Sequence, residues 1–553
     1  MSDNNKYNLT MLLPKTDFGM RGKLPTEEVK MMEFWNNIEL WKKLREQSKD
    51  KKKFILHDGP PYANGPIHIG TAANKILKDI INRTMQFEGY NSLYVPGWDC
   101  HGLPIEWQIE KQYRKKGKKK EDIDIKDFRN ECREFAQKWI EEQKKSFIRL
   151  FVLADWNKPY TTMAYESEAI ILKEFSKFFL NGSLYQGSKP VMWSPIEKTA
   201  LAEAEIEYHD IDSTSIYVAF KVKNSPNKLL ENTSIVIWTT TPWTIPGNRA
   251  IAFGDSIDYC IFKVQESKNN FIKDNKYLVA KSLLEEVCER CDINKFELVR
   301  EIKGEELNNI ICYHPFSKIG FDYNVPLLKA KFVEDSGGTG FVHIAPCYGE
   351  DDYYLALDNN IVIKDIVKDD GCYKDNTPIF SGIHVFKAHL SVIEKLEEQN
   401  KLLGSRVYRH SYPHSWRSKK PIIYRTTPQW FISMKSNNLK DKAMQGIEDT
   451  KWIPKSSKNR IQSMVENRPD WCVSRQRSWG VPLTIFINKN TGEPLKDEKV
   501  MERIIEDVKK RGSDVWLSDN PLKYLEKDYN PDDYYAVKDI LDVWFDSGTS
   551  HAF

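Results

Sequence analysis

The chain has 553 residues, of which 40% are hydrophobic and 12% aromatic, and its formal net charge is +3. At roughly 150 residues per domain, this length predicts three or four domains with sizeable apolar cores. No run of residues approaches the ~20 consecutive apolar residues of a membrane-spanning helix. The small net charge neither requires nor excludes a nucleic-acid partner, because local clustering of basic residues decides that question.

The cellular compartment is predicted from the N-terminus and the cysteines. The first residues, MSDNNKYNLTMLLPKTDF, contain no apolar signal-peptide core and are not rich in arginine, which predicts a cytoplasmic protein. Nine cysteines are scattered along the chain without the spacing of a disulfide framework. We therefore expect reduced thiols.

Four segments differ in their residue pattern. Residues 1–50 combine a polar leader with a helix expected from Glu27 to Glu46, and residues 51–185 alternate strand-like and helix-like runs, as in a parallel α/β layer. Residues 186–400 form a β-rich module, and residues 401–553 return to a mixed pattern. The strands expected in the β-rich module include Ser215–Val222, Ser234–Trp238, Tyr259–Val264 and Phe341–Ile344. An insertion that splits a nucleotide-binding fold is the economical interpretation.

The segment from His57 to Glu106 is the most informative part of the chain. A β-prone run, Phe54–Leu56, leads into a loop rich in glycine and proline, and apolar residues then recur at helical spacing. These apolar residues are Ile69, Ala73, Ile76, Leu77, Ile80 and Ile81. Backbone N–H groups at such a helix start favour phosphate, and a nearby imidazole can donate to a phosphate oxygen. Ordinary α/β packing explains the loop taken alone equally well.

Two further patterns have plain explanations. Cys288 and Cys291 form a CxxC pair, with Cys312 and His314 roughly twenty residues further on, and zinc could use four such ligands. The pair stands in a charged, helix-like stretch, which favours two thiols one helical turn apart without a metal. The basic block Arg114–Lys120 is interpreted as a solvated loop rather than as a phosphate contact.

Long motifs stand in the order found in class I aminoacyl-tRNA synthetases. They are LPKTDF (residues 13–18), GPPYANGPIHIG, NKILKD, YVPGWDCHGLPIE, WTTTPWTIPGNRA, GTGFVHIAP, NRPDWCVSRQRSWGVP and DVWFDSG. The chain resembles this family from Leu13 to Phe553, and within it the isoleucine-specific enzymes, because Thr241 stands where the valine and leucine enzymes typically carry arginine. The resemblance implies an α/β class I fold, in which a Rossmann-like nucleotide-binding domain is split by a β-rich editing insertion.

The resemblance also implies a reaction and its partners. A synthetase of this specificity joins isoleucine to its tRNA with ATP and Mg²⁺, through isoleucyl-adenylate, and hydrolyses misattached valine. The first step is attack of a carboxylate on the α-phosphate of ATP, which depends on positioning and charge stabilisation more than on a protein nucleophile. We expect a monomer without membrane contact.

Three residues at the start of the predicted helix are the expected ATP contacts. His68 resembles the first histidine of the family's HIGH signature and would donate to an ATP phosphate, while Gly70 would let the nucleotide approach the backbone closely. Thr71 stands in place of the second histidine, and its hydroxyl can donate a hydrogen bond but carries no positive charge. His68 and Thr71 are thus the expected catalytic residues, whereas an isolated His-x-Gly would favour a plain helix cap.

The amino-acid subsite is expected around the GWDCHG motif. Asp99 resembles the carboxylate that holds the α-ammonium group of the amino acid through a charge-assisted contact. Pro60 and Trp544 resemble walls of the pocket for the isoleucine side chain. A helix-capping aspartate and a core tryptophan are the alternatives for Asp99 and Trp544.

A basic and aromatic cluster is the expected tRNA contact. Arg475, Arg477 and Trp479 would suit an RNA backbone and its terminal bases. Structural salt bridges account for the two arginines equally well.

The β-rich module resembles the editing domain of the family. A pocket that selects by size discriminates against one missing methylene only ~10–200-fold, and isoleucine against valine in these enzymes is the usual example. One wall of the expected editing pocket is formed by Thr239, Thr240, Thr241 and Asn248, and the other by His343 and Asp352. Hydroxyl groups would hold the ester carbonyl or a water, and Asp352 would bind the α-ammonium of misattached valine; a β-edge turn with satisfied hydroxyls is the alternative. The sequence departs from the family at Cys347–Gly349, where a histidine often precedes the glycine.

Two family features are missing from the sequence. Ser194, Ser415 and Ser418 stand near the places where some relatives have zinc-binding cysteines, and serine is a poor zinc ligand, so we predict no metal there. The KMSKS loop follows DVWFDSG in the family and is missing here, whereas the lysine-rich Lys455–Lys458 lies before that motif. We expect an N-terminal portion that ends inside the second half of the nucleotide-binding fold. An editing hydrolase or tRNA-binding module without synthetic activity is the alternative.

Overall fold

The computed structural model describes residues 10–12, 22–517 and 519–553, so the LPKTDF motif lies outside the described residues. The α-helices are α2 (Leu24–Asn37), α3 (Leu40–Ser48), α4 (Ile69–Phe87), α5 (Leu103–Lys115), α6 (Ile125–Arg149), α7 (Tyr165–Leu180), α8 (Leu284–Arg290), α9 (Glu350–Asp358), α10 (Ala388–Glu398), α11 (Leu439–Asp449), α12 (Ser456–Glu466), α13 (Glu498–Arg511), α14 (Asp514–Leu517) and α15 (Val543–Gly548). None of the helices in this part of the chain has both the length and the apolar character needed to cross a membrane.

The strands are short in one part of the molecule and long in the other. They are β1 (Lys53–Phe54), β2 (Asn91–Ser92), β3 (Gly97–Trp98), β4 (Tyr160–Thr161), β5 (Leu184–Ser194), β6 (Thr199–Ala200), β7 (Ile206–Asn224), β8 (Thr233–Thr239), β9 (Ala250–Phe253), β10 (Asp258–Ser267), β11 (Lys276–Ala280), β12 (Ile293–Lys303), β13 (Ile311–Tyr313), β14 (Asn324–Lys329), β15 (Phe341–Ile344), β16 (Leu402–Ser415), β17 (Ile423–Ile432), β18 (Trp471–Cys472), β19 (Ser474–Arg475), β20 (Phe486–Asn488), β21 (Tyr534–Ala536) and β22 (Ile540–Leu541).

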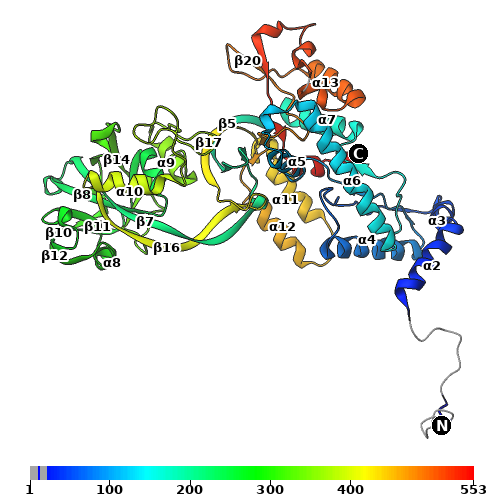
Figure 1. Cartoon of the computed structure of the whole chain (residues 1–553), viewed down its shortest axis with the longest axis horizontal. Helices are drawn as coiled ribbons and strands as arrows, with labels where there is room; N and C mark the ends of the chain where they lie inside the picture. Colours follow the sequence, from blue (N-terminus) through cyan, green and yellow to red (C-terminus); the bar gives the residue numbers. More distant parts are fainter. Residues whose placement is uncertain (1–9, 13–21, 518) are drawn as a thin grey trace.

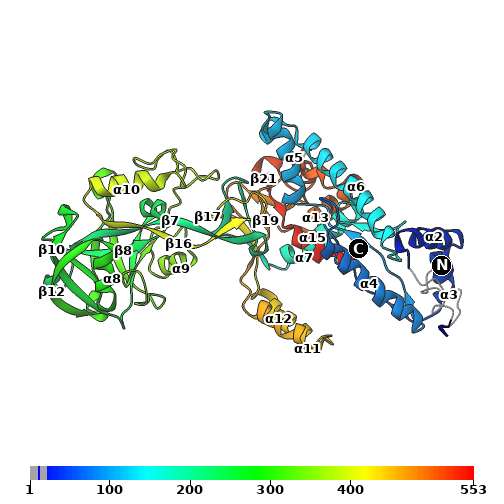
Figure 2. The ribbon, with the colours of Figure 1, turned by 60° about the horizontal axis from the view of Figure 1, so that its bottom comes forward.

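Two lobes are joined by long strands (Figure 1). The β-rich lobe, at the left of Figure 1, contains β8 to β15 with α8, α9 and α10, and the α/β lobe contains α2 to α7 and the segment from α13 to α15. β7 and β16 run between the lobes as an antiparallel ribbon, and β5 and β17 form a second antiparallel pair. The turned view in Figure 2 shows the same separation, with α11 and α12 projecting from the region between the lobes.

A ten-stranded sheet forms the β-rich lobe. Its order is β12-β10-β11-β8-β7-β13-β14-β9-β15, and β16 pairs with β7. The residues from Ser215 to Phe220 in β7 are all buried, because apolar and aromatic side chains on both faces of the strand pack against neighbours. The four strands that the sequence predicts in this module are confirmed as parts of β7, β8, β10 and β15.

Parallel strand pairs organise the α/β lobe. β1 pairs with β2, and β3 with β4, both in parallel. α4 connects β1 to β2, as the strand–loop–helix pattern predicts. Segments from both ends of the chain meet in one core, where Trp479 packs with Trp98 and Phe147.

The helix expected from Glu27 to Glu46 is two helices. α2 ends at Asn37, and Glu39, with a φ of 50°, precedes α3 in the left-handed region. A left-handed residue interrupts the helical hydrogen-bond pattern. Asn36 and Asn37 precede the break, and asparagine is a weak helix former.

Helix α4 has its apolar side toward solvent. Ile69, Leu77 and Ile80 are 87%, 61% and 54% exposed, whereas Lys75 and Asp79 are buried. An amphipathic surface helix ordinarily buries its apolar stripe. In α4 the polar stripe is the one that faces the protein, and the reason lies in the ionic contacts described next.

Candidate active site

A buried carboxylate fixes α4 to the loop in front of it. Asp58 accepts hydrogen bonds from Lys75, from Lys78 Nζ at 2.5 Å, from Tyr94 Oη at 3.0 Å and from the Gly97 amide at 3.0 Å. Burial alone would raise the pKa of Asp58, but the two ammonium groups outweigh burial and lower it. Burial lowers the pKa of Lys75 to about 8. A buried lysine needs such a partner, and this need turns the polar side of α4 inward.

The loop between β1 and α4 is also fixed from α6. Gln143 Nε2 donates to the carbonyl oxygens of Tyr62, at 2.9 Å, and Gly65, at 2.7 Å, while Gln143 Oε1 accepts from Trp98 Nε1 at 3.0 Å. Gln143 is buried. Sequence reasoning missed this residue, because a single glutamine on a helix carries no motif.

The three expected ATP contacts lie together at the start of α4. His68 Nδ1 accepts from the Gly70 amide at 3.1 Å and from the Thr71 amide at 3.4 Å, so the imidazole caps the helix. Since Nδ1 accepts, Nε2 carries the proton in the neutral ring and can donate to a further group. A Cβ atom at Gly70 would lie 3.0 Å from His68 Cε1, so a side chain there would crowd the ring. The cap geometry and an ATP contact through Nε2 are compatible.

Asp99 is a buried carboxylate with little protein compensation. Its backbone is bonded to the loop, since its amide donates to Pro61 O at 3.0 Å and its carbonyl accepts from the Ala63 amide at 2.9 Å. Its side chain accepts from Thr162 Oγ1 at 3.4 Å. Burial, and then the nearby Asp546, raises the pKa of Asp99 to about 8. A buried carboxyl group in this state favours a cationic ligand.

The α15 helix closes one side of the Asp99 segment. Its first residue, Val543, lies so close to Gly102 that a Cβ atom there would be 3.2 Å from the valine Cβ. Trp544 is 51% exposed, so it is not a core tryptophan, and its amide donates to the capping Asp542 at 3.2 Å. The structure thus places the expected pocket wall Trp544 at the surface of a helix that packs against the GWDCHG segment, and Pro60 in the loop bonded to Asp99.

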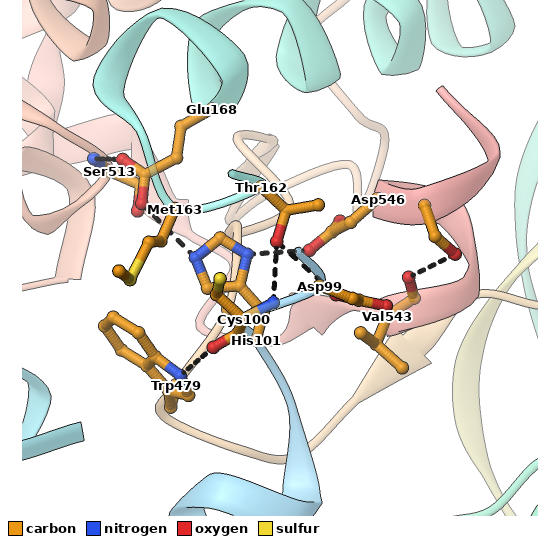
Figure 3. A network of polar contacts seen from close by, with 12 residues as sticks. Asp99, Cys100, His101, Thr162, Met163, Glu168, Trp479, Ser513, Val543 and Asp546 are labelled. Atoms are coloured by element: carbon orange, nitrogen blue, oxygen red, sulfur yellow. Dashed lines mark hydrogen bonds and ion pairs between the residues drawn. The ribbon is translucent and has the colours of Figure 1, made fainter. Parts of the chain in front are cut away.

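A buried histidine links three segments beside Asp99 (Figure 3). His101 Nδ1 lies 2.8 Å from Asp546 Oδ2 on α15, and its Nε2 lies 3.4 Å from Glu168 Oε1 on α7. Burial alone would lower the pKa of His101, but its interactions with the two carboxylates raise it to about 9. Sequence reasoning missed His101, although it stands two residues after Asp99 in the GWDCHG motif.

The expected tRNA contacts are buried in the α/β lobe. Arg475 Nη2 lies 2.8 Å from Asp542 Oδ2, Arg477 Nη1 donates to Glu197 O at 2.7 Å, and Trp479 Nε1 donates to Cys100 O at 2.7 Å. All three side chains are almost completely buried. This is the arrangement of the alternative, structural ion pairs, and RNA contact would require the side chains to leave these partners. We therefore assign the three residues to the core.

The threonine-rich wall of the β-rich lobe forms a continuous hydrogen-bonded network. Thr239 Oγ1 and Thr241 Oγ1 are 3.2 Å apart, Thr241 Oγ1 and Thr244 Oγ1 3.3 Å, and Thr244 Oγ1 lies 2.8 Å from His343 Nε2. Asn248 Nδ2 lies 2.9 Å from His343 Nδ1. The network joins both expected walls, and Thr240 adjoins it. Thr244, which sequence reasoning missed, stands in the same TTTPWT motif.

The protonation of this network follows from its geometry. Because Asn248 Nδ2 also donates to Ala250 O, it is the amide nitrogen, so His343 Nδ1 accepts and Nε2 donates to Thr244. Burial lowers the pKa of His343 to about 4, so the ring is neutral at pH 7. Asp352 accepts from the Ala345 amide at 2.8 Å, and burial raises its pKa to about 6.

The serines at the expected metal-free position are joined by a carboxylate. Ser415 Oγ donates to Glu197 Oε1 at 2.9 Å, and the Ser418 amide donates to the same oxygen at 3.0 Å. The Glu197 amide donates to Ser194 Oγ at 3.3 Å. Within residues 10–12, 22–517 and 519–553, no group of three or more His, Cys, Asp or Glu is placed to hold a metal ion. Cys288 and Cys291 are both buried.

A comparison of the sequence with models of known protein families shows which family the chain belongs to. The family described as "tRNA synthetases class I (I, L, M and V)" matches residues 30–552. The chain belongs to this class I synthetase family. The family prediction made from the motifs is therefore confirmed.

The class I synthetase chain is similar to curated isoleucine–tRNA ligases. The ligase of Pelagibacter ubique (strain HTCC1062) is 53% identical over 541 residues, which cover 98% of this chain and 60% of that protein. The ligase of Gluconobacter oxydans (strain 621H) is 47% identical over 565 residues, with coverages of 99% and 59%. The chain spans about 60% of the length of these relatives.

Among solved structures, the likeness is weak. The LeuRS–tRNA–LeuAMS ternary complex from Agrobacterium radiobacter K84 gives a TM-score of 0.37 at 16% sequence identity, covering 95% of this chain and 59% of that one. This likeness supports no placement of individual elements.

Proposed function

We propose that this chain contains the amino-acid activation site of an isoleucine–tRNA ligase and a hydrolytic editing site. The observation that carries the proposal is Asp99, a buried carboxylate without a cationic partner of its own, on a segment bonded to the loop that leads into α4. The identities of 53% and 47% to isoleucine–tRNA ligases support the choice of amino acid.

The proposed activation step uses few protein groups. The carboxylate oxygen of isoleucine attacks the α-phosphorus of ATP, the bond to the bridging oxygen breaks, and pyrophosphate leaves with the electron pair. Asp99 binds the α-ammonium, Pro60 and Trp544 flank the side chain, and His68 Nε2 donates to a phosphate oxygen. Thr71 donates as a neutral hydroxyl. Mg²⁺ enters with ATP as part of the substrate.

We propose that the second step transfers the activated isoleucine to the terminal ribose of its tRNA. A ribose hydroxyl oxygen attacks the carbonyl carbon of the adenylate, the bond from that carbon to the phosphate oxygen breaks, AMP leaves with the electron pair, and the hydroxyl proton passes to water. Arg475, Arg477 and Trp479 are not part of this proposal, because they are buried among protein partners.

The fold proposal follows from how the two ends of the chain meet. We propose a Rossmann-like domain split by an editing insertion, with its two parts in residues 51–185 and 401–553. The hydrogen bond from Trp479 Nε1 to Cys100 O and the one from the Gly102 amide to Trp479 O hold segments of these parts together. The boundaries at 185 and 400 remain predictions.

The editing proposal rests on the threonine network. His343 is neutral, and both of its ring nitrogens are hydrogen-bonded, one to Thr244 and one to Asn248. It therefore orients hydroxyl groups and does not act as a general base. The hydroxyls of Thr239 and Thr241 would hold the ester carbonyl or the attacking water, and Asp352 would bind the ammonium of valine. Water adds to the ester carbonyl, and the tRNA ribose oxygen leaves and takes up a proton.

Asp99→Asn tests the activation site. In the protein that carries this chain, isoleucine-dependent ATP–pyrophosphate exchange should show a Michaelis constant for isoleucine raised about 10- to 100-fold, because a hydrogen bond to a charged group contributes roughly 1.5–3 kcal/mol. The Michaelis constant for ATP should stay unchanged.

Asp127→Asn, on the exposed side of α6, is the matched control. An Asp99→Asn protein with the parent response to isoleucine would contradict the activation site. Parent exchange activity for valine or leucine, with none for isoleucine, would contradict the choice of substrate.

A further inference from the structure

His101 is a charged group enclosed entirely by protein. The side chain is completely buried, its ring lies edge-on to Trp479 at 5.1 Å, and its two nitrogens face carboxylates from two different helices. Those carboxylates, Asp546 and Glu168, belong to segments far apart in the sequence. The activation step proposed above does not use any of the three groups.

The charges around His101 leave one carboxylate uncompensated. Glu168 is shared between His101 and Arg133 Nη2, which lies 3.4 Å from Glu168 Oε1, and it also accepts from the Ser513 amide at 2.7 Å. Asp546 is taken by the imidazolium at 2.8 Å. With these two acids matched by two cations, Asp99 is the acid of this cluster that has no cation of its own.

The other charged groups that face the cluster have partners elsewhere. Asp542, at the start of α15, is paired with Arg475, and Arg129 is paired with Asp514. The Tyr62 hydroxyl is buried against the cluster, and burial keeps its pKa well above the ordinary value, so it stays neutral. The Cys100 thiol, between Asp99 and His101, is neutral for the same reason.

We propose that His101 is a positioning residue for isoleucine: its imidazolium neutralises Asp546 and ties α15 and α7 to the GWDCHG segment, so that the remaining negative charge is presented by Asp99 to the substrate ammonium. This inference rests on the proposed function, since it needs an amino acid at Asp99. In this inference His101 sets the ionisation of Asp99 without itself contacting isoleucine.

The inference has a specific consequence for protons. With an Asp99 pKa of about 8 in the free protein, the carboxyl group is mostly protonated at pH 7 and must lose its proton when the ammonium binds. Isoleucine affinity should therefore rise as pH rises toward about 8 and be accompanied by proton release. At higher pH, loss of the proton from His101, with a pKa of about 9, should reverse the rise.

The test is isothermal titration of the 553-residue chain with isoleucine from about pH 6 to 9, in two buffers of different ionisation enthalpy. His101→Asn removes the charge and keeps a polar group near the Nδ1 position. Its isoleucine affinity at pH 7.5 should fall about tenfold. The pH range over which isoleucine affinity rises should also move up by about one pH unit, because the Asp99 carboxyl loses a stabilising cation. Affinity for ATP should not change.

The outcomes separate the inference from the proposed function. If His101→Asn weakens isoleucine binding by the same factor at every pH, so that the rise in affinity stays at the parent pH, the role of His101 is purely structural and the inference is overturned. A folded parent chain that binds no isoleucine at any pH would overturn the proposed function, and the inference with it.

A measurement on the parent protein covers the case in which the variant does not fold. Nitrogen-15 spectra of histidine-labelled chain should contain one ring that stays protonated on both nitrogens until about pH 9. If all eleven histidines are neutral by pH 8, the inference is wrong. The conservative His101→Gln variant retains a donor toward Glu168 and should keep the fold. Its isoleucine affinity should rise over the same upward-shifted pH range as that of His101→Asn.

Discussion

Asp99 and Asp352 are similar carboxylates in different lobes, and each is proposed to bind the ammonium group of an aliphatic amino acid. Burial raises the pKa of both, to about 8 for Asp99 and about 6 for Asp352. The difference arises because Asp99 also faces the acidic Asp546, whereas Asp352 accepts a backbone hydrogen bond from Ala345. Hydrolysis should therefore persist at a lower pH than activation.

Asp352→Asn should slow the hydrolysis of valyl-tRNA for isoleucine about 10- to 100-fold, because the amide cannot offer a negative charge to the ammonium. Isoleucine-dependent ATP–pyrophosphate exchange should be unaffected. The parent protein should lose deacylation as pH falls through about 6, where Asp352 takes up a proton, and regain it above. Release of labelled valine from mischarged tRNA measures the rate.

The neighbouring Asp351 is exposed and provides the control for that measurement. Asp351→Asn should hydrolyse valyl-tRNA at the parent rate. Parent hydrolysis by a folded Asp352→Asn protein would remove Asp352 from the editing site.

At the scale of elements, α4 is held by ions rather than by its apolar stripe. The pair of Lys75 and Asp58 is almost completely buried, and Lys78 adds a second ammonium at the edge. Breaking such a pair by removing one partner leaves an uncompensated charge in the interior, which costs roughly 3–5 kcal/mol. Replacing both partners with uncharged groups costs much less.

Asp58→Asn should accordingly lower the free energy of unfolding of the α/β lobe by about 3–5 kcal/mol. Combining it with Lys75→Met should recover most of that loss, because the unpaired ammonium is gone. Urea unfolding followed by tryptophan fluorescence measures both, and Asp50→Asn at an exposed position is the control. A double variant no more stable than Asp58→Asn would show that the ion pair does not fix α4.

Sequence periodicity predicts where α4 is but not which side of it is buried. The spacing of apolar residues gives a stripe, and the start at Ile69 is correct, but the orientation depends on Asp58 and Tyr94, which come from other segments. The position of His101 shows the same limit, since its partner Asp546 is 445 residues away in the sequence. A local pattern contains no information about such distant partners.

The basic cluster near residue 475 shows how a composition signal is ambiguous. Arginines beside a tryptophan suit RNA, and they equally suit buried acids. The acids that bind Arg477, Glu106 and Glu110, stand on α5 and cannot be connected with it from the sequence. Four strands of the β-rich lobe were predictable, because parts of β7, β8, β10 and β15 contain runs of β-branched and aromatic residues that indicate a strand without any distant partner.

At the scale of the whole molecule, the two proposed sites have separate cores. The β-rich lobe is built on one apolar cluster and the α/β lobe on others, and long strands connect them. Substitutions at Asp99 and Asp352 share no partners, so their effects on activation and hydrolysis should be independent.

The outward apolar side of α4 has a consequence for how the chain behaves as a solute. Ile69, Leu77, Ile80 and Phe87 are exposed apolar side chains on one helix, and exposed apolar surface promotes association between molecules. The 553-residue chain should therefore scatter more light as its concentration rises, and more strongly with added sulfate, which strengthens apolar contact. Leu77→Lys with Ile80→Lys should raise the concentration at which scattering begins, whereas Leu390→Lys, at an exposed leucine on α10 of the other lobe, should not. Equal scattering by all three proteins would mean that colloidal stability is set elsewhere on the surface.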